Sequence, residues 1–426
     1  MTIPIATYRL QFRNGMTFRR AASLVPYFRR LGISHLYASP VFAATADSTH
    51  GYDVTDPNRF DPALGTKADF NALSDALKAE GIGLILDIVP NHMAASLENP
   101  WWASVVTHGR ASPHAHVFDI DWSRRLTLPW LSRPFDAAVE EGEVTLTADA
   151  DGNPALSLSG MTIPLVPGSL PDEDAPSLET VHARQNFELI HWRDAPKQLS
   201  YRRFFEVTGL VGVNVEDERV FEETHRLILD LVRSGRVDGL RVDHIDGLSD
   251  PAAYLDRLRK AIGPQTYLLV EKILEDGEDL PSAWPVSGTT GYEFIDRLTH
   301  LLVDKKGAER LRRNYAALGG ATDYHGGLRE ARDLLIARNF EGEVAALRRM
   351  AVQLALSHEE EQGASQADID EALQALLREF PVYRTYGTAG SMPETDRTLL
   401  DALAERLRKT LSNTGGRALD FLVATL

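Results

Sequence analysis

Four short clusters of polar residues could carry chemistry, because each follows an apolar run with the composition of a strand. The clusters are His50–Asp53, Asp87–His92, Arg241–His244 and Glu271–Lys272. Side chains at the carboxyl ends of parallel strands meet at one edge of a sheet, where barrel and open α/β enzymes build their active sites. The position of all four clusters at that end favours a functional site over coincidence.

Arg241 and Asp243 form the most specific pair. Side chains in a strand alternate between two faces, so these two point the same way while Leu240 and Val242 point toward covering helices. A neighbouring guanidinium favours the ionised form of Asp243, as a carboxylate nucleophile requires at neutral pH. Glu271 follows three apolar residues, and we expect dry surroundings that raise its pKa and keep it protonated. One ionised and one protonated carboxyl group is the pairing that glycosidic bond chemistry uses.

Each cluster also has a purely structural interpretation. An Arg–Asp pair at a strand end is as often a stabilising ion pair, and an Asn–His pair in a turn more often holds a loop than binds a ligand. Taken alone, Tyr52 would be a half-buried turn aromatic, and Glu271–Lys272 a surface charge pair. Only their common position at the strand ends changes this balance.

The composition indicates an ordinary folded protein. The chain has 426 residues, of which 43% are hydrophobic and 25% charged, enough for a large core with one or two accessory domains. A formal net charge of −16 argues against nucleic acid as a partner. The absence of cysteine excludes disulfides and a thiolate nucleophile and fits the cytoplasm. Neither a secretory signal nor a membrane-spanning apolar run is recognisable, so we expect a soluble protein without membrane partners.

The elements that position the clusters alternate between strand and helix. Strands are expected over Ile5–Phe12, Ile33–Tyr37, Ile82–Val89, Val237–Val242 and Tyr267–Val270. Helices are expected between them, over Phe18–Leu31, Lys67–Glu80, Glu218–Arg233 and Pro251–Ala261. This order indicates parallel βαβ units. Only about five barrel strands can be counted, and a parallel sheet of that size cannot close on itself.

Two segments depart from this alternation. After Met93 the sequence becomes rich in Trp and Pro, and the turn residues Asp151–Pro154 separate two apolar runs, Val144–Leu146 and Leu156–Leu158, which predicts a β-hairpin in an inserted subdomain. From Leu298 onward the pattern is helical, with the longest expected helix over Glu343–His358. The expected division is residues 1–92 for the first part of the barrel, 93–205 for the inserted subdomain, 206–297 for the rest of the barrel and 298–426 for a helical domain.

Three of the clusters resemble signature regions of the α-amylase superfamily, glycoside hydrolase family 13. DIVPNH over 87–92, GLRVDH over 239–244 and Glu271 are similar to its first three regions. More narrowly, the sequence resembles the maltooligosyltrehalose synthase family over nearly its whole length. The motifs that carry this likeness include STHGYDV over 48–54, YRRFF over 201–205, HIDGL over 244–248, VEKIL over 270–274 and GTTGY over 288–292.

The resemblance implies a TIM (β/α)8-type barrel, incomplete in this chain, with an inserted subdomain and a helical domain. It also implies intramolecular transglucosylation of a maltooligosaccharide, in which the reducing-end α-1,4 bond becomes an α,α-1,1 bond and a terminal trehalosyl unit forms. Asp243 would be the nucleophile, and Glu271 would protonate the departing oxygen and later act as base. The substrate-binding residues so implied are Tyr52, His50, His92, Arg241, Asp87, Asn91, His244 and Lys272.

The acceptor in this reaction is the released glucose, whose anomeric hydroxyl must outcompete water, so a closed pocket is required. Trp101, Trp102, Trp122 and Trp192 are candidates to line it, and each is equally well explained as a core or interface aromatic. Some α-amylases bind calcium near the position of Asn91, but no dense set of oxygen ligands stands at recognisable spacing here. We expect no metal and no cofactor.

Two departures from the family pattern matter. Ser200 stands where the family has Asn before YRRFF, which would weaken a contact of that loop. The superfamily's fourth region contains a His-Asp pair with a third carboxylate, yet His300, His325 and His358 are not followed by Asp. We expect a longer protein, or a second polypeptide that completes the barrel, in preference to a helical segment that covers its open edge. The chain alone would then be weakly active or inactive. The alternatives are an α-1,4-glucan hydrolase and a noncatalytic or split-subunit glucan-binding protein.

Overall fold

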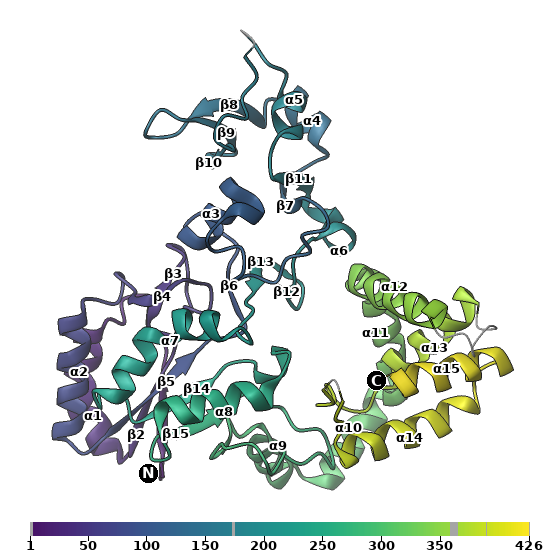
Figure 1. The fold of residues 1–426 in the computed structure, drawn as a ribbon. Helices are drawn as coiled ribbons and strands as arrows, with labels where there is room; N and C mark the ends of the chain where they lie inside the picture. Colours follow the sequence, from purple (N-terminus) through teal and green to yellow (C-terminus); the bar gives the residue numbers. More distant parts are fainter. Residues whose placement is uncertain (1–2, 173–174, 358–364, 389, 426) are drawn as a thin grey trace. The chain divides into compact units, whose positions relative to one another are not determined.

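The computed structural model describes residues 3–172, 175–357, 365–388 and 390–425. The chain divides into two compact units (Figure 1). The sheet unit contains Met1–Lys272 and Leu280–Thr290, and the helical unit contains Ile273–Asp279 and Gly291–Leu426. The four-part domain division expected from the sequence stays a prediction.

Six parallel strands form the main sheet of the sheet unit. Their order is β1 (Thr7–Leu10), β2 (His35–Ala38), β5 (Gly83–Ile88), β14 (Gly239–Val242), β15 (Tyr267–Val270) and β16 (Gly288–Thr289). Each strand is added to the same edge as the strand before it, whereas strand order reverses in a doubly wound sheet. The sheet is therefore a curled half-barrel of the (β/α)8 type, and the expected fold class is confirmed.

All five expected barrel strands are present, with ends shifted by no more than a few residues. The sixth, β16, was missed. It has only two residues, one of them glycine, so no apolar run or alternation marks it, and it is recognisable only from its pairing with β15.

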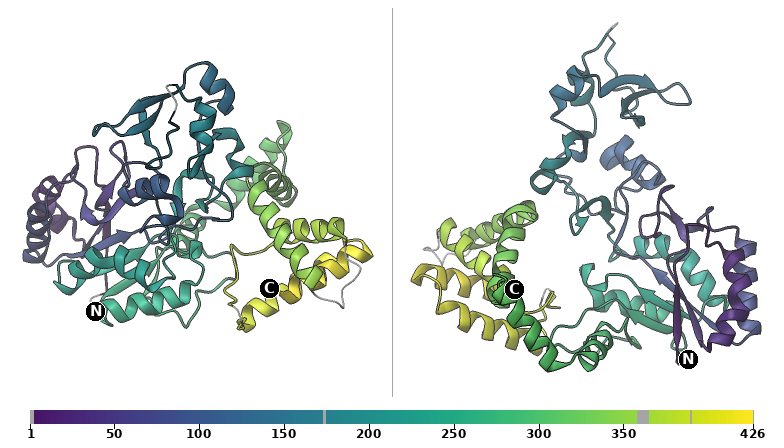
Figure 2. Two further views of the ribbon diagram at one scale, coloured as in Figure 1. Left: turned by 45° about the horizontal axis from the view of Figure 1, so that its top comes forward. Right: turned by 180° about the vertical axis from the view of Figure 1, so that it is seen from behind.

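Four helices follow strands of this sheet: α1 (Phe18–Leu31), α2 (Lys67–Ala79), α7 (Glu218–Arg233) and α8 (Pro251–Ile262). Each begins at a residue whose side chain accepts a backbone N–H: Thr17, Thr66, Asp217 and Asp250. α1 and α2 lie side by side (Figures 1 and 2), and their contact includes an edge-to-face pair, Phe18 and Phe70, with ring centroids 5.3 Å apart. Aromatic side chains thus pack α1 and α2 against each other.

A long segment is inserted between β5 and α7. Its larger elements are β6 (His92–Ala94), α3 (Pro100–His108), β7 (Leu126–Leu131), α4 (Phe135–Glu140), β8 (Val144–Ala148), β9 (Pro154–Leu158), β10 (Met161–Pro164), α5 (Leu178–Ala183), β11 (Phe187–His191), α6 (Ala195–Gln198), β12 (Arg203–Phe204) and β13 (Val207–Gly212). The expected hairpin is confirmed, because β8 and β9 pair antiparallel across the 149–153 turn. β13 pairs with β6, so the end of the insertion returns beside His92. Earlier, β3 (Phe42–Ala44) pairs with β4 (Val54–Phe60).

Ser200, which precedes the YRRFF motif, makes two hydrogen bonds with Thr127. It is buried, its hydroxyl accepts the Thr127 N–H at 2.8 Å, and its own N–H donates to Thr127 Oγ1 at 2.8 Å. The serine therefore anchors the start of the YRRFF loop to β7, and the weakening expected from the replacement of Asn stays a prediction.

The helical unit contains α9 (Tyr292–Leu302), α10 (Lys305–Ala317), α11 (Tyr324–Arg338), α12 (Glu341–Ser357), α13 (Gln366–Glu379), α14 (Glu394–Arg408) and α15 (Asn413–Thr425) (Figure 2). Its core joins the last three through Ile369, Leu376, Leu403, Leu407 and Leu419. The helix expected over Glu343–His358 is present to Ser357, and His358 lies outside the described residues. Over the whole described part of the chain, every helix is too short or too polar to cross a membrane.

Candidate active site

Arg241 lies between three carboxyl groups at the carboxyl ends of three adjacent strands. Its Nη1 donates to Asp87 Oδ1 at 2.8 Å and to Asp243 Oδ1 at 2.6 Å, and its Nη2 lies 2.9 Å from Glu271 Oε1. The register of β5 and β14 pairs Arg241 with Asp87, and the two-residue period of the strand puts Asp243 on the same side, as predicted. The fold therefore places three carboxyl groups around the single guanidinium of Arg241. We call Asp87, Arg241, Asp243 and Glu271 the carboxyl cluster.

The charges of the carboxyl cluster do not balance if all three acids are ionised. Burial raises the pKa of Asp243 to about 7 and also raises the pKa of Asp87, although Arg241 lowers both. Burial works against the charge of Arg241, but the surrounding acids hold its pKa above the usual value, so it stays protonated. Arg241 favours the ionised form of Asp243, as expected, but burial and the charges of Asp87 and Glu271 outweigh its effect on the pKa, because one guanidinium is shared among three acids.

Glu271 also differs from the expectation. Its side chain is 24% exposed, against 0% for Asp87 and 9% for Asp243. Glu271 is therefore the most solvent-exposed acid of the three, and its surroundings are not dry. One carboxylate oxygen pairs with Arg241, and the other accepts the His244 N–H at 2.9 Å. The carboxyl group is accessible for a substrate but is held by the cation in this structure.

Tyr52 reaches the carboxyl cluster from the loop between β3 and β4. Its hydroxyl donates to Asp87 Oδ2 at 2.6 Å and accepts from Arg9 Nη2 at 3.0 Å, and the Tyr37 hydroxyl donates to the same Asp87 oxygen at 2.8 Å. Burial and the nearby Asp87 hold the pKa of Tyr52 well above its usual value, so the phenol stays neutral. Sequence reasoning missed Arg9 and Tyr37, whose only signal was their position in β1 and β2.

His50 stands next to Tyr52 but does not join the carboxyl cluster in the contacts observed. Its backbone carbonyl accepts from Gln11 Nε2 at 3.0 Å, and its Nδ1 accepts the Tyr52 N–H at 3.1 Å. Asp53 accepts hydrogen bonds from Thr45 and Ser48. These bonds fix the loop that presents Tyr52.

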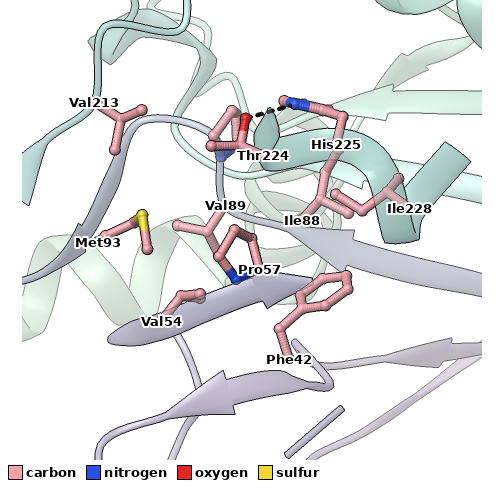
Figure 3. Close-up of a pocket in the computed structure, with 11 residues that line it drawn as sticks. Phe42, Val54, Pro57, Ile88, Val89, Met93, Val213, Thr224, His225 and Ile228 are labelled. Atoms are coloured by element: carbon pink, nitrogen blue, oxygen red, sulfur yellow. Dashed lines mark hydrogen bonds between the residues drawn. The ribbon is translucent and has the colours of Figure 1, made fainter. Parts of the chain in front are cut away.

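Asn91 and His92 follow β5 and are almost fully buried. Asn91 Nδ2 lies 3.2 Å from His92 Nδ1, and the His92 ring packs on Phe204 with centroids 4.3 Å apart. The turn that carries them is seated on an apolar pocket lined by β3, β4, the end of β5 and α7, including Val89 and Met93 (Figure 3). Burial lowers the pKa of His92 to about 3, so its imidazole is neutral.

His244 has a left-handed backbone (φ 46°), and its ring packs against Phe204 and Phe205. Gly247 is required nearby, because a Cβ there would lie 2.2 Å from the His244 ring and 2.6 Å from Asn91 Oδ1. Lys272 is fully buried and its Nζ lies 3.1 Å from Asp246 Oδ2. Lys272 therefore makes an internal ion pair here, and it does not meet the solvent side of the site.

The four tryptophans have different environments. Trp102 is a core residue with edge-to-face contacts to Phe118 and Tyr201, so its proposed role in a pocket lining is wrong. Trp101 stacks on His114, and Trp122 is half-buried. Trp192 is 56% exposed, with the Arg193 guanidinium above its ring.

Comparison with known proteins decides the family. The alpha-amylase catalytic domain matches residues 21–276, which contain most of the sheet unit and the whole carboxyl cluster. The chain belongs to the alpha-amylase family. The match includes β14 and β15, the strands that end in Asp243 and Glu271.

More specific relatives are maltooligosyl trehalose synthases. A protein described by that name from Mycobacterium tuberculosis is 39% identical over 390 residues, which cover 89% of this chain and 48% of the relative. The maltooligosyltrehalose synthase of Arthrobacter ramosus superposes with a TM-score of 0.84 at 36% identity, covering 99% of this chain and 52% of that structure. A Sulfolobus tokodaii structure described as a hypothetical maltooligosyl trehalose synthase gives a TM-score of 0.77 at 33% identity and covers 54% of that chain. The chain thus spans about half the length of these relatives.

Proposed function

We propose that this chain carries the catalytic carboxylates for intramolecular transglucosylation of maltooligosaccharides, an isomerase reaction that yields a terminal trehalosyl unit. The observation that carries the proposal is the carboxyl cluster at the ends of β5, β14 and β15, with two candidate reacting acids on one guanidinium. Relatives named for this activity, alike over nearly the whole chain, support the choice among amylase-family reactions.

The reaction proceeds by double displacement. Asp243 attacks the anomeric carbon of the penultimate sugar while Glu271 gives its proton to the departing glycosidic oxygen, which leaves a covalent glycosyl ester and a free glucose. The anomeric hydroxyl of that glucose then attacks the same carbon, Glu271 takes its proton, and the Asp243 ester bond breaks. Two inversions give net retention, and the product bond is α,α-1,1.

The remaining residues bind and orient the sugar. Tyr52 offers a fixed ring for stacking, because Asp87 and Arg9 hold its hydroxyl. Neutral His92 can donate to a sugar hydroxyl. Glu271 must leave its ion pair with Arg241 before it can protonate the glycosidic oxygen. Substrate binding therefore replaces this ion pair with a hydrogen bond from Glu271 to the glycosidic oxygen.

The third carboxylate of the superfamily's fourth region is proposed to come from a polypeptide outside these 426 residues, in the same protein or a partner. Six parallel strands leave room for two more in an eight-stranded barrel. Incubating the purified chain with maltopentaose tests both parts, first alone and then with the part of the Mycobacterium relative that lies outside the match.

Product analysis separates the three functions. Transglucosylation removes reducing ends and forms a trehalosyl terminus, whereas hydrolysis increases reducing ends. Trehalosyl product only in the mixture supports both the reaction and the partner, and robust product from the chain alone contradicts the partner. Maltopentaose binding without turnover in either sample, unchanged in Asp243→Asn, would establish a noncatalytic glucan-binding protein.

A further inference from the structure

Arg202 lies outside the carboxyl cluster, yet its guanidinium joins several segments around the site. Nη1 donates to Asn91 Oδ1 at 2.8 Å and to the Gly247 carbonyl at 3.4 Å, and Nη2 donates to the Val213 carbonyl at 3.2 Å. Nε donates to Asp119 Oδ2 at 2.9 Å. The side chain therefore ties the turn after β5 to the HIDGL segment after β14 and to the insertion.

The contact with Arg202 decides how the Asn91 amide is oriented. A guanidinium only donates hydrogen bonds, so the atom that faces Nη1 must be the amide oxygen. The amide nitrogen then faces His92 Nδ1, 3.2 Å away. Since an amide nitrogen donates, Nδ1 is the acceptor, and the single proton of the neutral ring lies on Nε2.

We propose that Arg202 is a positioning residue that sets the tautomer of His92 through Asn91 and thereby keeps Nε2–H as a donor for a substrate hydroxyl. Without the guanidinium, the amide can turn and offer its oxygen to a proton on Nδ1, and Nε2 then only accepts. The statement that a substrate hydroxyl accepts this hydrogen bond rests on the proposed function. The tautomer of His92 is a property of the chain without substrate and can be measured separately.

The surroundings of Arg202 allow a small cation to reach it. The guanidinium borders a polar cavity of about 580 Å³ that is open to solvent and is also lined by His116, Asp119, Asn214, Glu216, Asp217 and Ser249. A variant that loses the Arg202 side chain should therefore admit guanidinium from solution.

Long-range ¹⁵N–¹H NMR correlation on the ¹⁵N-histidine-labelled chain reports the tautomer, with His92→Gln used to assign the signal. We expect the Nε2–H pattern in the wild type and a shift toward Nδ1–H in Arg202→Met. Arg124→Met is the matched control, because Arg124 also pairs with one carboxylate, Asp121, and donates to two backbone carbonyls, but it touches neither Asn91 nor His92. An unchanged pattern in Arg202→Met would overturn the inference.

A second variant keeps the test decisive if Arg202→Met does not fold. Asn91→Asp offers only acceptor oxygens, so it should force the proton onto Nδ1, and a wild-type pattern there would equally contradict the relay. In Arg202→Ala, millimolar methylguanidinium should restore the Nε2–H pattern, which a general loss of structure would not permit.

Activity gives an independent readout. With maltopentaose and the added segment of the Mycobacterium relative, Arg202→Met should lower kcat by about 10- to 100-fold, as loss of groups that orient a ligand side chain commonly does, with a smaller change in KM. Equal kcat values for Arg202→Met and Arg124→Met would count against the positioning role. If the tautomer shifts but the wild type does not transform glucans even with the added segment of the Mycobacterium relative, the proposed function fails and the relay stands.

Discussion

At the amino end of the main sheet, His35 and Asp238 lie beside the starts of β5 and β14. At the carboxyl end, Asp87 lies in the last part of β5 and Asp243 follows β14. The amino-end groups serve the backbone. Asp238 accepts the Leu84 N–H at 2.8 Å, and the His35 ring fills the space beside Gly83, where a Cβ would lie 2.3 Å from it. Burial lowers the pKa of His35, so a neutral ring packs there.

The carboxyl-end groups face one another instead. Three acids surround one guanidinium, and burial raises the pKa values of two of them. Such an arrangement is costly for the fold, and perturbed acids that converge in this way are typical of functional sites. The chemistry of the same residue types therefore depends on whether their partners are backbone groups or other charges.

The largest difference between the two ends should appear with Asp243→Asn. The amide keeps the shape of the side chain but cannot act as a nucleophile, so trehalosyl formation should fall on the order of 10⁴-fold while the fold persists. Asp238→Asn is the control at the other end and should stay within about twofold of wild type. Steady-state kinetics on both variants measures the loss of activity, and circular dichroism checks that both are folded. Equal losses of activity in the two variants would contradict the proposed difference between the two ends of the sheet.

Arg241→Met should unbalance the carboxyl end further. Removing the cation leaves three neighbouring acids without their shared partner, and breaking a buried pair in this way costs about 3–5 kcal/mol of folding free energy. Urea unfolding at pH 7 measures the loss. The companion Arg241→Met/Asp87→Asn variant should recover part of it, and an unchanged unfolding midpoint for Arg241→Met would contradict the assigned electrostatics.

The pH dependence should follow Asp243. Because its folded-state pKa lies at about 7, above the ordinary 3.8, the folded chain keeps a proton that the unfolded chain releases. The contribution of Asp243 to stability is therefore present below about pH 4 and is lost as pH rises toward 7. Relative to Asp243→Asn, the wild type should become less stable across this window in urea titrations, and parallel curves would argue against the raised pKa.

Activity should change in the opposite direction, since the nucleophile must be ionised. Below pH 7, kcat/KM should fall by up to tenfold per pH unit. An acid limb centred near pH 4 would mean that the substrate-free cluster holds no extra proton on Asp243.

Gly83→Ala tests the amino end with the smallest expected effect. A methyl group there meets the His35 ring, and overpacking of this kind costs about 1–3 kcal/mol of folding free energy. Activity per folded molecule should not change, because no candidate catalytic residue lies at this end. Thermal unfolding measures the loss of stability, and kinetics on the same samples measures the activity. A loss of kcat without a loss of stability would contradict a purely structural role for the amino end.

The sequence predicted much of the fold because apolar runs and helix caps mark most of the sheet unit. The five longer barrel strands and the β8–β9 hairpin could be recognised by pattern alone. β16 could not, because two residues with a glycine have no periodicity. Its existence depends on a tertiary neighbour, β15.

The sequence predicted which residues form the candidate site, but it did not predict how their charges interact. Alternation placed Arg241 beside Asp243, yet sequence could not reveal that Arg241 also pairs with Glu271, since that contact depends on how neighbouring strands are aligned. Arg202 belongs to the YRRFF motif, but the sequence assigned it no role. Its partner Asn91 lies 111 residues away along the chain, and only the fold brings the two side chains together.

Trapping the covalent intermediate tests whether Asp243 is the nucleophile. A fluorinated α-glucosyl fluoride should leave one glycosyl group per active chain, and peptide mass spectrometry should locate it on Asp243, with no labelling of Asp243→Asn. Trehalosyl product formed while the label sits on Asp87, on Glu271 or on no residue would contradict the assignment of Asp243 as the nucleophile.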